Sequence, residues 1–124
     1  MPLIRAATAP TFDLPGLTVI GLASPSRGAR ETSAWRLTLA PGTPGLPHSV
    51  DREEIFVALS GRASVTLGDE SFELGAGDAL VVPAEQVFSL ANLGPDAFEA
   101  VALVPVGALA RISNDEAFSP PWTL

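Results

Sequence analysis

The stretch PGTPGLPHSVDREEIFVALSGRASVTLGDESFELGAGDALVVPAEQVFSLAN, residues 41–92, determines the fold of this chain. Short runs in which apolar and polar residues alternate are separated by clusters of glycine and proline. Alternation with a period of two is typical of a half-buried β-strand, and glycine and proline are residues that turns favour. The stretch therefore predicts several short strands joined by tight turns.

Similar runs continue on both sides of this stretch. Strands are predicted at residues 17–23, 33–40, 55–59, 63–67, 71–74, 79–82, 87–90 and 98–105. Gly68-Asp69 predicts a hairpin, because glycine accepts the positive φ that such a turn needs. Short strands with frequent Gly/Pro turns, and no convincing long helix, indicate an all-β sandwich or barrel.

The two ends of the chain are rich in proline and flank a single β-domain, residues 17–105. Residues 1–16 are expected to form an extended arm on a sheet edge or over a partner subunit, because proline lacks the amide donor for central sheet pairing. Residues 106–124 form a tail that ends in SPPWTL. Trp122 in this tail is expected to cap the barrel or to contact a partner subunit.

Composition limits the possible partners. The chain has 124 residues, enough for one domain with its own core. Seven basic against fourteen acidic residues give a net charge of −7, which would repel a phosphate backbone and excludes nucleic-acid binding. Cysteine is absent, which excludes disulfides and thiolate metal sites. No secretory signal or membrane span is recognisable, so a cytoplasmic protein without a membrane partner is expected.

Residues in the first half of the central stretch keep a distinctive spacing. Gly42, His48, Glu54 and Gly61 fit the pattern G-x5-H-x-H-x3-E-x6-G. The second histidine of the pattern is replaced by Val50.

A second pattern, G-x5-P-x-G-x2-H-x3-N, follows in the same stretch. Gly77, Pro83 and Asn92 fit it, whereas Glu85 replaces the second glycine and Phe88 replaces the histidine. The two patterns together resemble the signature motifs of the cupin superfamily. The resemblance implies a small single-domain cupin with an all-β fold, an antiparallel barrel of the jelly-roll type.

The departures from the motifs fall on the metal ligands. In cupins that bind metal, the ligands are the two histidines and the glutamate of the first motif and the histidine of the second, which correspond here to His48, Val50, Glu54 and Phe88. His48 is the only histidine and there is no cysteine, so one subunit cannot supply a two-His-one-carboxylate iron site or three nitrogen or sulfur ligands for zinc. We expect no cofactor and no strong transition-metal site. The metal alternative is a divalent cation held weakly by His48 and Glu54, with Asp51 and Glu53 nearby.

His48 and Glu54 are the main candidate site residues. His48 has three interpretations: a structural histidine hydrogen-bonded to Glu54, a polar anchor for a ligand, or a general acid or base with a pKa near neutrality. Glu54 is expected to point into the barrel beside His48, because a buried carboxylate needs a partner, and Glu53 is expected to point outward. The expected ligand-binding residues are His48, Val50, Glu54, Gln86, Phe88 and Trp35.

Three functions from different classes fit these residues. The preferred interpretation is a small-molecule-binding protein whose ligand lies inside the barrel. The second is an enzyme, either a metal-dependent dioxygenase or isomerase, or a metal-free sugar isomerase or epimerase that uses His48 and Glu54 as catalytic acid and base. The third is a structural dimerisation module, since small single-barrel cupins are commonly homodimers. A homodimer is expected in each case.

Overall fold

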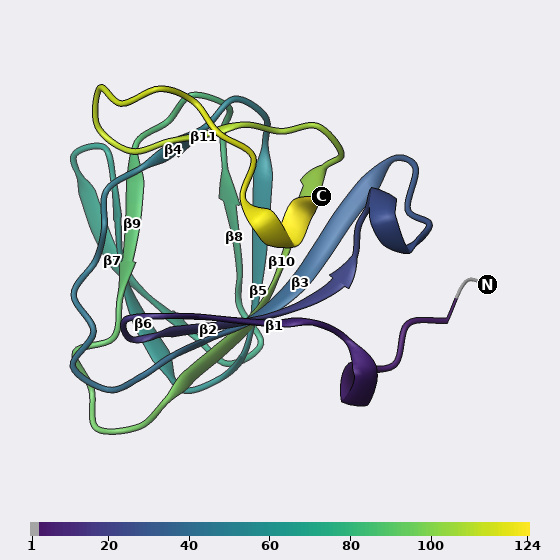
Figure 1. The fold of residues 1–124 in the computed structure, drawn as a ribbon. Helices are drawn as coiled ribbons and strands as arrows, with labels where there is room; N and C mark the ends of the chain where they lie inside the picture. Colours follow the sequence, from purple (N-terminus) through teal and green to yellow (C-terminus); the bar gives the residue numbers. More distant parts are fainter. Residues whose placement is uncertain (1–2) are drawn as a thin grey trace.

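A computed structural model describes residues 3–124; Met1 and Pro2, the first residues of the predicted arm, lie outside the described residues. The described chain consists of antiparallel strands and three short 3-10 turns, η1 (Ala6–Thr8), η2 (Pro25–Arg27) and η3 (Pro121–Thr123) (Figure 1). Within residues 3–124, no helix is long and apolar enough to cross a membrane.

The strands form two main sheets that enclose the barrel (Figure 1). The larger sheet has six strands in the order β1-β2-β3-β10-β5-β8, and the smaller has three in the order β7-β6-β9. The six are β1 (Thr11–Leu14), β2 (Leu17–Ala23), β3 (Thr32–Leu39), β10 (Phe98–Pro105), β5 (Glu54–Ser60) and β8 (Ala79–Val82). The three are β7 (Glu70–Gly75), β6 (Arg62–Leu67) and β9 (Phe88–Ala91). A two-stranded ribbon pairs β4 (Ser49–Val50) with β11 (Ala110–Arg111).

The predicted all-β jelly roll is confirmed, and the strands at 79–82 and 98–105 have their predicted bounds. Three short strands, β1, β4 and β11, were not predicted. In the N-terminal arm, Thr11–Leu14 form β1, the edge strand of the large sheet, with Pro10 and Pro15 just outside it. Both prolines therefore leave the amide donors of the strand intact. In the tail, β11 forms because β4 offers it an unpaired edge.

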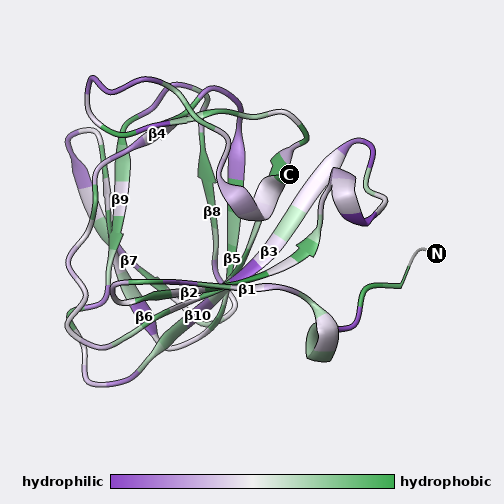
Figure 2. Cartoon of the chain, in the orientation of Figure 1, coloured by the Kyte–Doolittle hydropathy of each residue, from purple (hydrophilic) through white to green (hydrophobic). Residues whose placement is uncertain are grey.

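Large and small side chains alternate across the inner face of the large sheet. Ala102 on β10 pairs with Trp35 on β3 and with Phe56 on β5, so a small residue separates two large rings. All three side chains are buried. Figure 2 shows the hydrophobic residues concentrated on the strands. This alternation lets bulky side chains from both sheets meet in the core.

Asn92, the last residue of the second motif, holds the two sheets together. Its fully buried side-chain amide donates to the carbonyl oxygens of Leu39 (2.9 Å) and Asp96 (2.8 Å), and its side-chain oxygen accepts from the amide of Gly94 (3.2 Å). These bonds satisfy both ends of a buried amide. The role of Asn92 is therefore structural.

The C-terminal tail returns to the barrel. Trp122 in η3 packs on Phe12 of β1 and Trp35 of β3, with ring centroids 6.0 and 6.3 Å apart. Figure 1 shows η3, in yellow, lying against the barrel. Trp122 therefore caps the interior, one of the two roles predicted for it.

Candidate functional site

The two motifs meet at one end of the barrel through His48 and Phe88. The amide of His48 donates to the carbonyl of Phe88 (3.0 Å), and the amide of Phe88 donates to the carbonyl of His48 (2.9 Å). The two rings lie with their centroids 4.4 Å apart. The backbone pairing thus places the only histidine directly over a buried aromatic side chain.

Glu54 lies on the inner face of the large sheet. It is the first residue of β5, its cross-strand neighbour on β8 is Val82, and its side chain shares the inward direction of Phe56. Only 4% of Glu54 is exposed, and its buried Oε1 has no hydrogen-bond partner among residues 3–124. Burial raises the pKa of Glu54 to about 8, because desolvation disfavours the charged form. At neutral pH this carboxyl group holds a proton.

His48 has a defined tautomer. Its Nδ1 lies 2.8 Å from the carbonyl oxygen of Leu46, so Nδ1 carries the proton and donates. Burial lowers the pKa of His48, while the bond to the Leu46 carbonyl acts in the opposite direction. The imidazole is therefore neutral at neutral pH, and its Nε2 is a hydrogen-bond acceptor.

The predicted hydrogen bond between His48 and Glu54 is wrong. No hydrogen bond joins them in the described part of the chain, where Nδ1 is bonded to Leu46 and Oε1 of Glu54 is unpartnered. The physical reason is that the two residues are positioned by different sheets. The backbone of His48 pairs with Phe88 of β9 in the small sheet, whereas Glu54 is the first residue of β5 in the large sheet.

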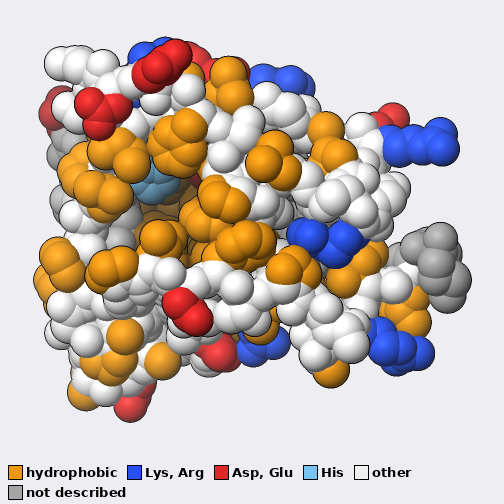
Figure 3. Space-filling view, viewed as in Figure 1, with side chains coloured by type: hydrophobic (Ala, Val, Ile, Leu, Met, Phe, Trp, Pro, Cys, Tyr) orange, Lys and Arg blue, Asp and Glu red, His pale blue; other side chains and the backbone are white. Residues whose placement is uncertain are grey.

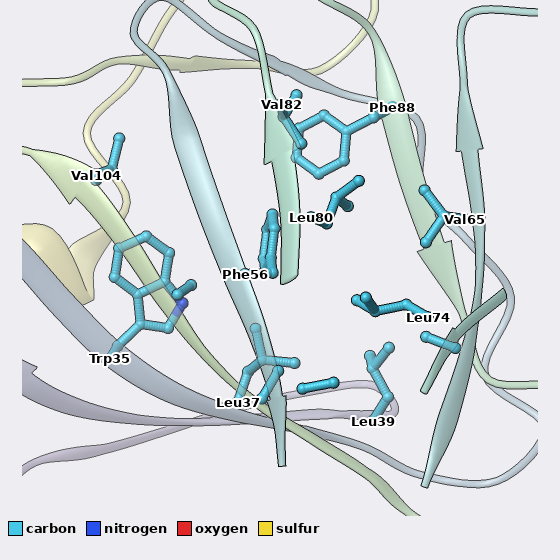
Figure 4. Close-up of a cluster of buried hydrophobic side chains, with 14 of the residues drawn as sticks. Trp35, Leu37, Leu39, Phe56, Val65, Leu74, Leu80, Val82, Phe88 and Val104 are labelled. Carbon is cyan, nitrogen blue, oxygen red and sulfur yellow. The ribbon is translucent and has the colours of Figure 1, made fainter. Parts of the chain in front are cut away.

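Aromatic side chains surround these two polar groups. Phe88, 1% exposed, lies between His48 and Phe56, whose ring centroid is 5.7 Å from that of Phe88. Figure 4 shows Trp35 and Phe88 projecting into the interior from opposite sides, with Phe56 between them. Val50 is buried as well, on β4. The residues at the two replaced metal positions, Val50 and Phe88, are thus part of the apolar wall.

Three other candidates lie apart from this group. The side-chain amide of Gln86 donates to the carbonyl of Val87 (3.1 Å), and this side chain lies against Gly68 at the turn between β6 and β7. Asp51 accepts from the amide of Leu109 (2.8 Å) through its carboxylate and so fixes the chain after β10. Glu53 is exposed, as predicted.

The donors present do not fit a transition metal. Of the four positions that bear ligands in metal-binding cupins, only His48 and Glu54 carry donor atoms. Over residues 3–124, no group of three or more His, Cys, Asp or Glu side chains is placed to hold a metal ion. One imidazole nitrogen and one carboxyl group fall short of the three protein ligands typical of such sites.

The surface is hollowed at more than one place. In Figure 3, His48, the pale blue side chain, lies in a recess ringed by hydrophobic side chains. Two other depressions, of about 730 and 430 Å³, do not include His48 or Glu54. The larger one is lined by the motif residue Asn92 and by polar residues that the sequence did not single out, among them Arg62, Glu73, Asp78 and Asp96. We place the candidate site at the recess, because the buried unpartnered carboxyl group and the neutral imidazole lie at that end of the barrel.

Solved structures with the same fold include several enzymes. The polyketide cyclase RemF from Streptomyces resistomycificus is 16% identical, with a TM-score of 0.81 over 94% of this chain and 87% of that protein. KdgF from a Halomonas species is 24% identical, with a TM-score of 0.71 over 82% of this chain and 92% of that one. A cupin-superfamily sugar phosphate isomerase from Silicibacter pomeroyi is 14% identical, with a TM-score of 0.75 over 92% and 83% of the two chains. At these identities the likeness shows the fold alone.

The sequence itself gives the family. No curated protein matches the chain. The model of the cupin domain family matches residues 35–104, more than half of the 124 residues and both motifs. The chain therefore belongs to the cupin family.

Proposed function

We propose that this protein binds a small, uncharged, partly aromatic molecule inside the barrel, with Glu54 and His48 as its polar anchors. The observation that carries the proposal is the buried carboxyl group of Glu54, whose Oε1 has no hydrogen-bond partner within residues 3–124. A buried polar group left unpaired costs about 1–3 kcal/mol. A ligand that pairs with Glu54 would recover that energy on binding.

The protonation states of the two anchors define the ligand's polar groups. Glu54 holds its proton at neutral pH, so it would donate to an oxygen of the ligand. Nε2 of neutral His48 would accept from a hydroxyl group. A ring that carries hydroxyl and carbonyl groups offers both partners, and the rings of Phe88, Phe56 and Trp35 would pack on its faces.

Charge argues against an anionic ligand. All seven basic residues of the chain are arginines, and every one is exposed or half-buried, so none lies in the core with Glu54. A carboxylate or phosphate inside the barrel would lose its hydration without gaining a cationic partner. The same argument disfavours phosphorylated sugars, although an isomerase of sugar phosphates has this fold.

Matched probes test this ligand class. 1-Naphthol and 1-naphthoate have the same ring system but differ in charge, and calorimetry with each measures the preference. We expect 1-naphthol to bind more tightly than the carboxylate, and Glu54→Leu to weaken 1-naphthol binding at least tenfold, or about 1.4 kcal/mol. Glu53→Leu is the control, because Glu53 is adjacent but exposed. Tighter binding of 1-naphthoate than of 1-naphthol would contradict the proposal. An equal loss of 1-naphthol affinity in Glu54→Leu and Glu53→Leu would also contradict it.

A second candidate function is metal-free acid–base catalysis. The opposite pKa shifts favour it, because they leave Glu54 as a proton donor and His48 as a proton acceptor at the same pH. In an enolisation, Nε2 of His48 would remove a proton from the carbon next to a carbonyl group while Glu54 protonates the carbonyl oxygen. The enol then returns to the ketone by the reverse transfers.

Deuterium exchange tests the catalytic candidate. In D2O, exchange at the α-carbon of 1-tetralone, followed by NMR, reports each enolisation. We expect the wild type to accelerate exchange, His48→Gln to abolish the acceleration, and Glu54→Gln to reduce it by at least tenfold, with Glu53→Gln unchanged. Exchange at the uncatalysed rate with the wild type, alongside tight binding of 1-naphthol, would leave the protein as a binder only.

The proposal includes the absence of a strong transition-metal site. It is supported by the donor count at the cupin ligand positions, where hydrocarbon of Val50 and Phe88 replaces two imidazoles. Elemental analysis of protein purified without chelators should give far less than one equivalent of iron, manganese, nickel or zinc per chain. One equivalent that is lost in His48→Ala would overturn this part of the proposal.

A further inference from the structure

A depression of about 430 Å³ lies between the N-terminal arm and η2. Its lining residues are Leu3, Ile4, Arg5, Thr8, Ala9 and Arg27. Figure 1 shows the N-terminal arm and η2 on one side of the molecule, and Figure 3 shows the recess of His48 on the other side. Pockets that hold small molecules commonly measure about 300–1,000 Å³. The depression is therefore large enough for a small ligand and is separate from the candidate site.

The charge of this depression is opposite to that of the chain. Arg5 and Arg27 line it, and no aspartate or glutamate is among its described lining residues. The chain as a whole has fourteen acidic and only seven basic residues. Neither Arg5 nor Arg27 is among the arginines that form ion pairs within residues 3–124. Two cations without a carboxylate partner at one depression attract an anion.

The guanidinium group of Arg27 is held in place by the backbone of β2. Its Nε donates to the carbonyl oxygen of Leu22 (2.8 Å). Its Nη2 lies over Gly21, where a Cβ atom would stand only 2.6 Å from that nitrogen. Nη2 is buried and has no hydrogen-bond partner among residues 3–124. A buried charged donor without a partner costs free energy, so an acceptor that pairs with this guanidinium group would recover that cost.

The donors of Arg27 and the apolar lining define the class of ligand. A guanidinium group presents parallel N–H donors that match the two oxygens of a carboxylate. Partial burial of Arg27 reduces screening by solvent, which strengthens its attraction for an anion in the depression. Leu3, Ile4 and Ala9 add hydrocarbon to the same lining. A carboxylate with an apolar chain would meet Arg27 and Arg5 with its head and cover these residues with its chain.

We propose that this depression, which we call the arm site, binds a carboxylate that carries an apolar chain, with Arg27 and Arg5 as its cationic partners. The arm site is independent of the ligand proposed for the barrel. The two sites have opposite charge preferences, because the core around Glu54 contains no arginine and the arm site contains two.

Three probes that differ in one part each test this ligand class. Octanoate has both the charge and the chain, 1-octanol has the chain alone, and acetate has the charge alone. We expect calorimetry to show that octanoate binds about tenfold more tightly than either of the others. Arg27→Gln should weaken octanoate binding about tenfold, and Arg5→Gln should weaken it by a smaller factor because Arg5 is exposed. Arg30→Gln is the matched control, since Arg30 is exposed in the same loop and does not line the arm site.

Gly21→Ala tests the position of Arg27 without changing any charge. The added Cβ atom would stand 2.6 Å from Nη2 of Arg27 and 3.3 Å from Cε1 of Phe12, so the flexible end of the arginine has to move. We expect octanoate binding to weaken, while circular dichroism reports an intact fold. Gly75→Ala is the control, because a Cβ atom there makes only an ordinary contact, 3.6 Å from Oδ2 of Asp78. A Gly21→Ala variant that binds octanoate as tightly as the wild type would overturn the proposed role of Arg27.

Amide chemical shifts locate each ligand and separate this inference from the proposed function. Octanoate should shift the amide signals of residues 5–9 and 21–28, whereas 1-naphthol should shift those around His48. Octanoate that fails to bind, or that shifts the signals around His48 instead, would overturn the arm site. Equal binding of octanoate and 1-octanol, or an equal loss in Arg27→Gln and Arg30→Gln, would also overturn it. A failure of 1-naphthol to bind would count against the barrel ligand alone.

Discussion

At the scale of single residues, Glu54 links stability to pH. Its pKa rises from 4.5 to about 8 on folding, because burial disfavours the carboxylate. Between these values the folded state binds a proton that the unfolded state has lost. The free energy of unfolding therefore falls as pH rises from about 4.5 to about 8 and changes little beyond. At alkaline pH the charged form of Glu54 lowers the free energy of unfolding, which is consistent with a role in binding or catalysis and not in stability.

Glu54→Gln isolates this effect, because glutamine has a similar shape and no charge at any pH. A shift of this size corresponds to a loss on the order of 3–5 kcal/mol across the window. We expect the variant to have roughly the stability of the wild type near pH 5. Near pH 8 it should be more stable than the wild type by a few kcal/mol, as urea denaturation will measure. Glu53→Gln should follow the wild type at both pH values, and a Glu54→Gln variant that loses stability in parallel with the wild type would show that Glu54 does not titrate in this range.

Glu85 carries a second residue-scale prediction. It replaces the glycine of the second motif, yet its φ is +69°, in the left-handed region that side chains other than glycine rarely adopt. Its amide donates to the carbonyl of Val50 (2.7 Å), which holds the backbone in this conformation. Because Glu85 is exposed, a glycine there would lose little besides strain.

We therefore expect Glu85→Gly to raise the free energy of unfolding by about 0.5–1 kcal/mol, despite the larger entropy of glycine in the unfolded chain. Thermal and urea denaturation will measure it. Ala84→Gly is a suitable control, because Ala84 is exposed next to Glu85 and has no positive φ, so glycine there should destabilise slightly. An equal decrease in the free energy of unfolding in Glu85→Gly and Ala84→Gly would show that the turn at Glu85 is not strained.

At the scale of elements, the short η3 turn closes the interior of the large sheet. Trp122 is its only large side chain, and it meets rings from two separate strands, Phe12 of β1 and Trp35 of β3. Truncation to alanine should cost about 2–3 kcal/mol, less than the loss of a fully buried tryptophan because Trp122 is half-buried. Trp122→Phe should restore more than half of this loss in thermal denaturation. An alanine variant as stable as the wild type would mean that the tail is detached in solution.

The sequence predicts elements much better than contacts between elements. Motif spacing and alternation are local, so they predict nearly all the long strands of the jelly roll. That His48 lies near Phe88 of the second motif is implied only by the resemblance to metal-binding cupins, in which both positions bear ligands. Spacing and alternation do not predict β11, whose pairing depends on the free edge of β4 more than fifty residues earlier. The hydrogen bond expected between His48 and Glu54 fails for a related reason. Which sheet carries each residue depends on the assembled barrel, and the register of one strand does not reveal it.

At the scale of the whole molecule, the net charge of −7 opposes the homodimer expected from the sequence, whereas the apolar outer face of β10, β5 and β8 favours it. The total charge of two approaching copies repels them at long range. Burial of Ile55, Val57 and Val81, which alternate with inward residues and so lie on that outer face, is insensitive to salt at moderate concentration. Salt screens the repulsion. Raising sodium chloride from about 20 mM to about 500 mM shortens the Debye length from roughly 20 Å to a few ångströms and should tighten the dimer on the order of tenfold. Sedimentation at several protein concentrations will measure the dissociation constant at each salt concentration. An interface held by ion pairs would weaken under the same change, so a dissociation constant that rises with salt would place the contact at charged surfaces elsewhere on the molecule rather than on the face of β10, β5 and β8.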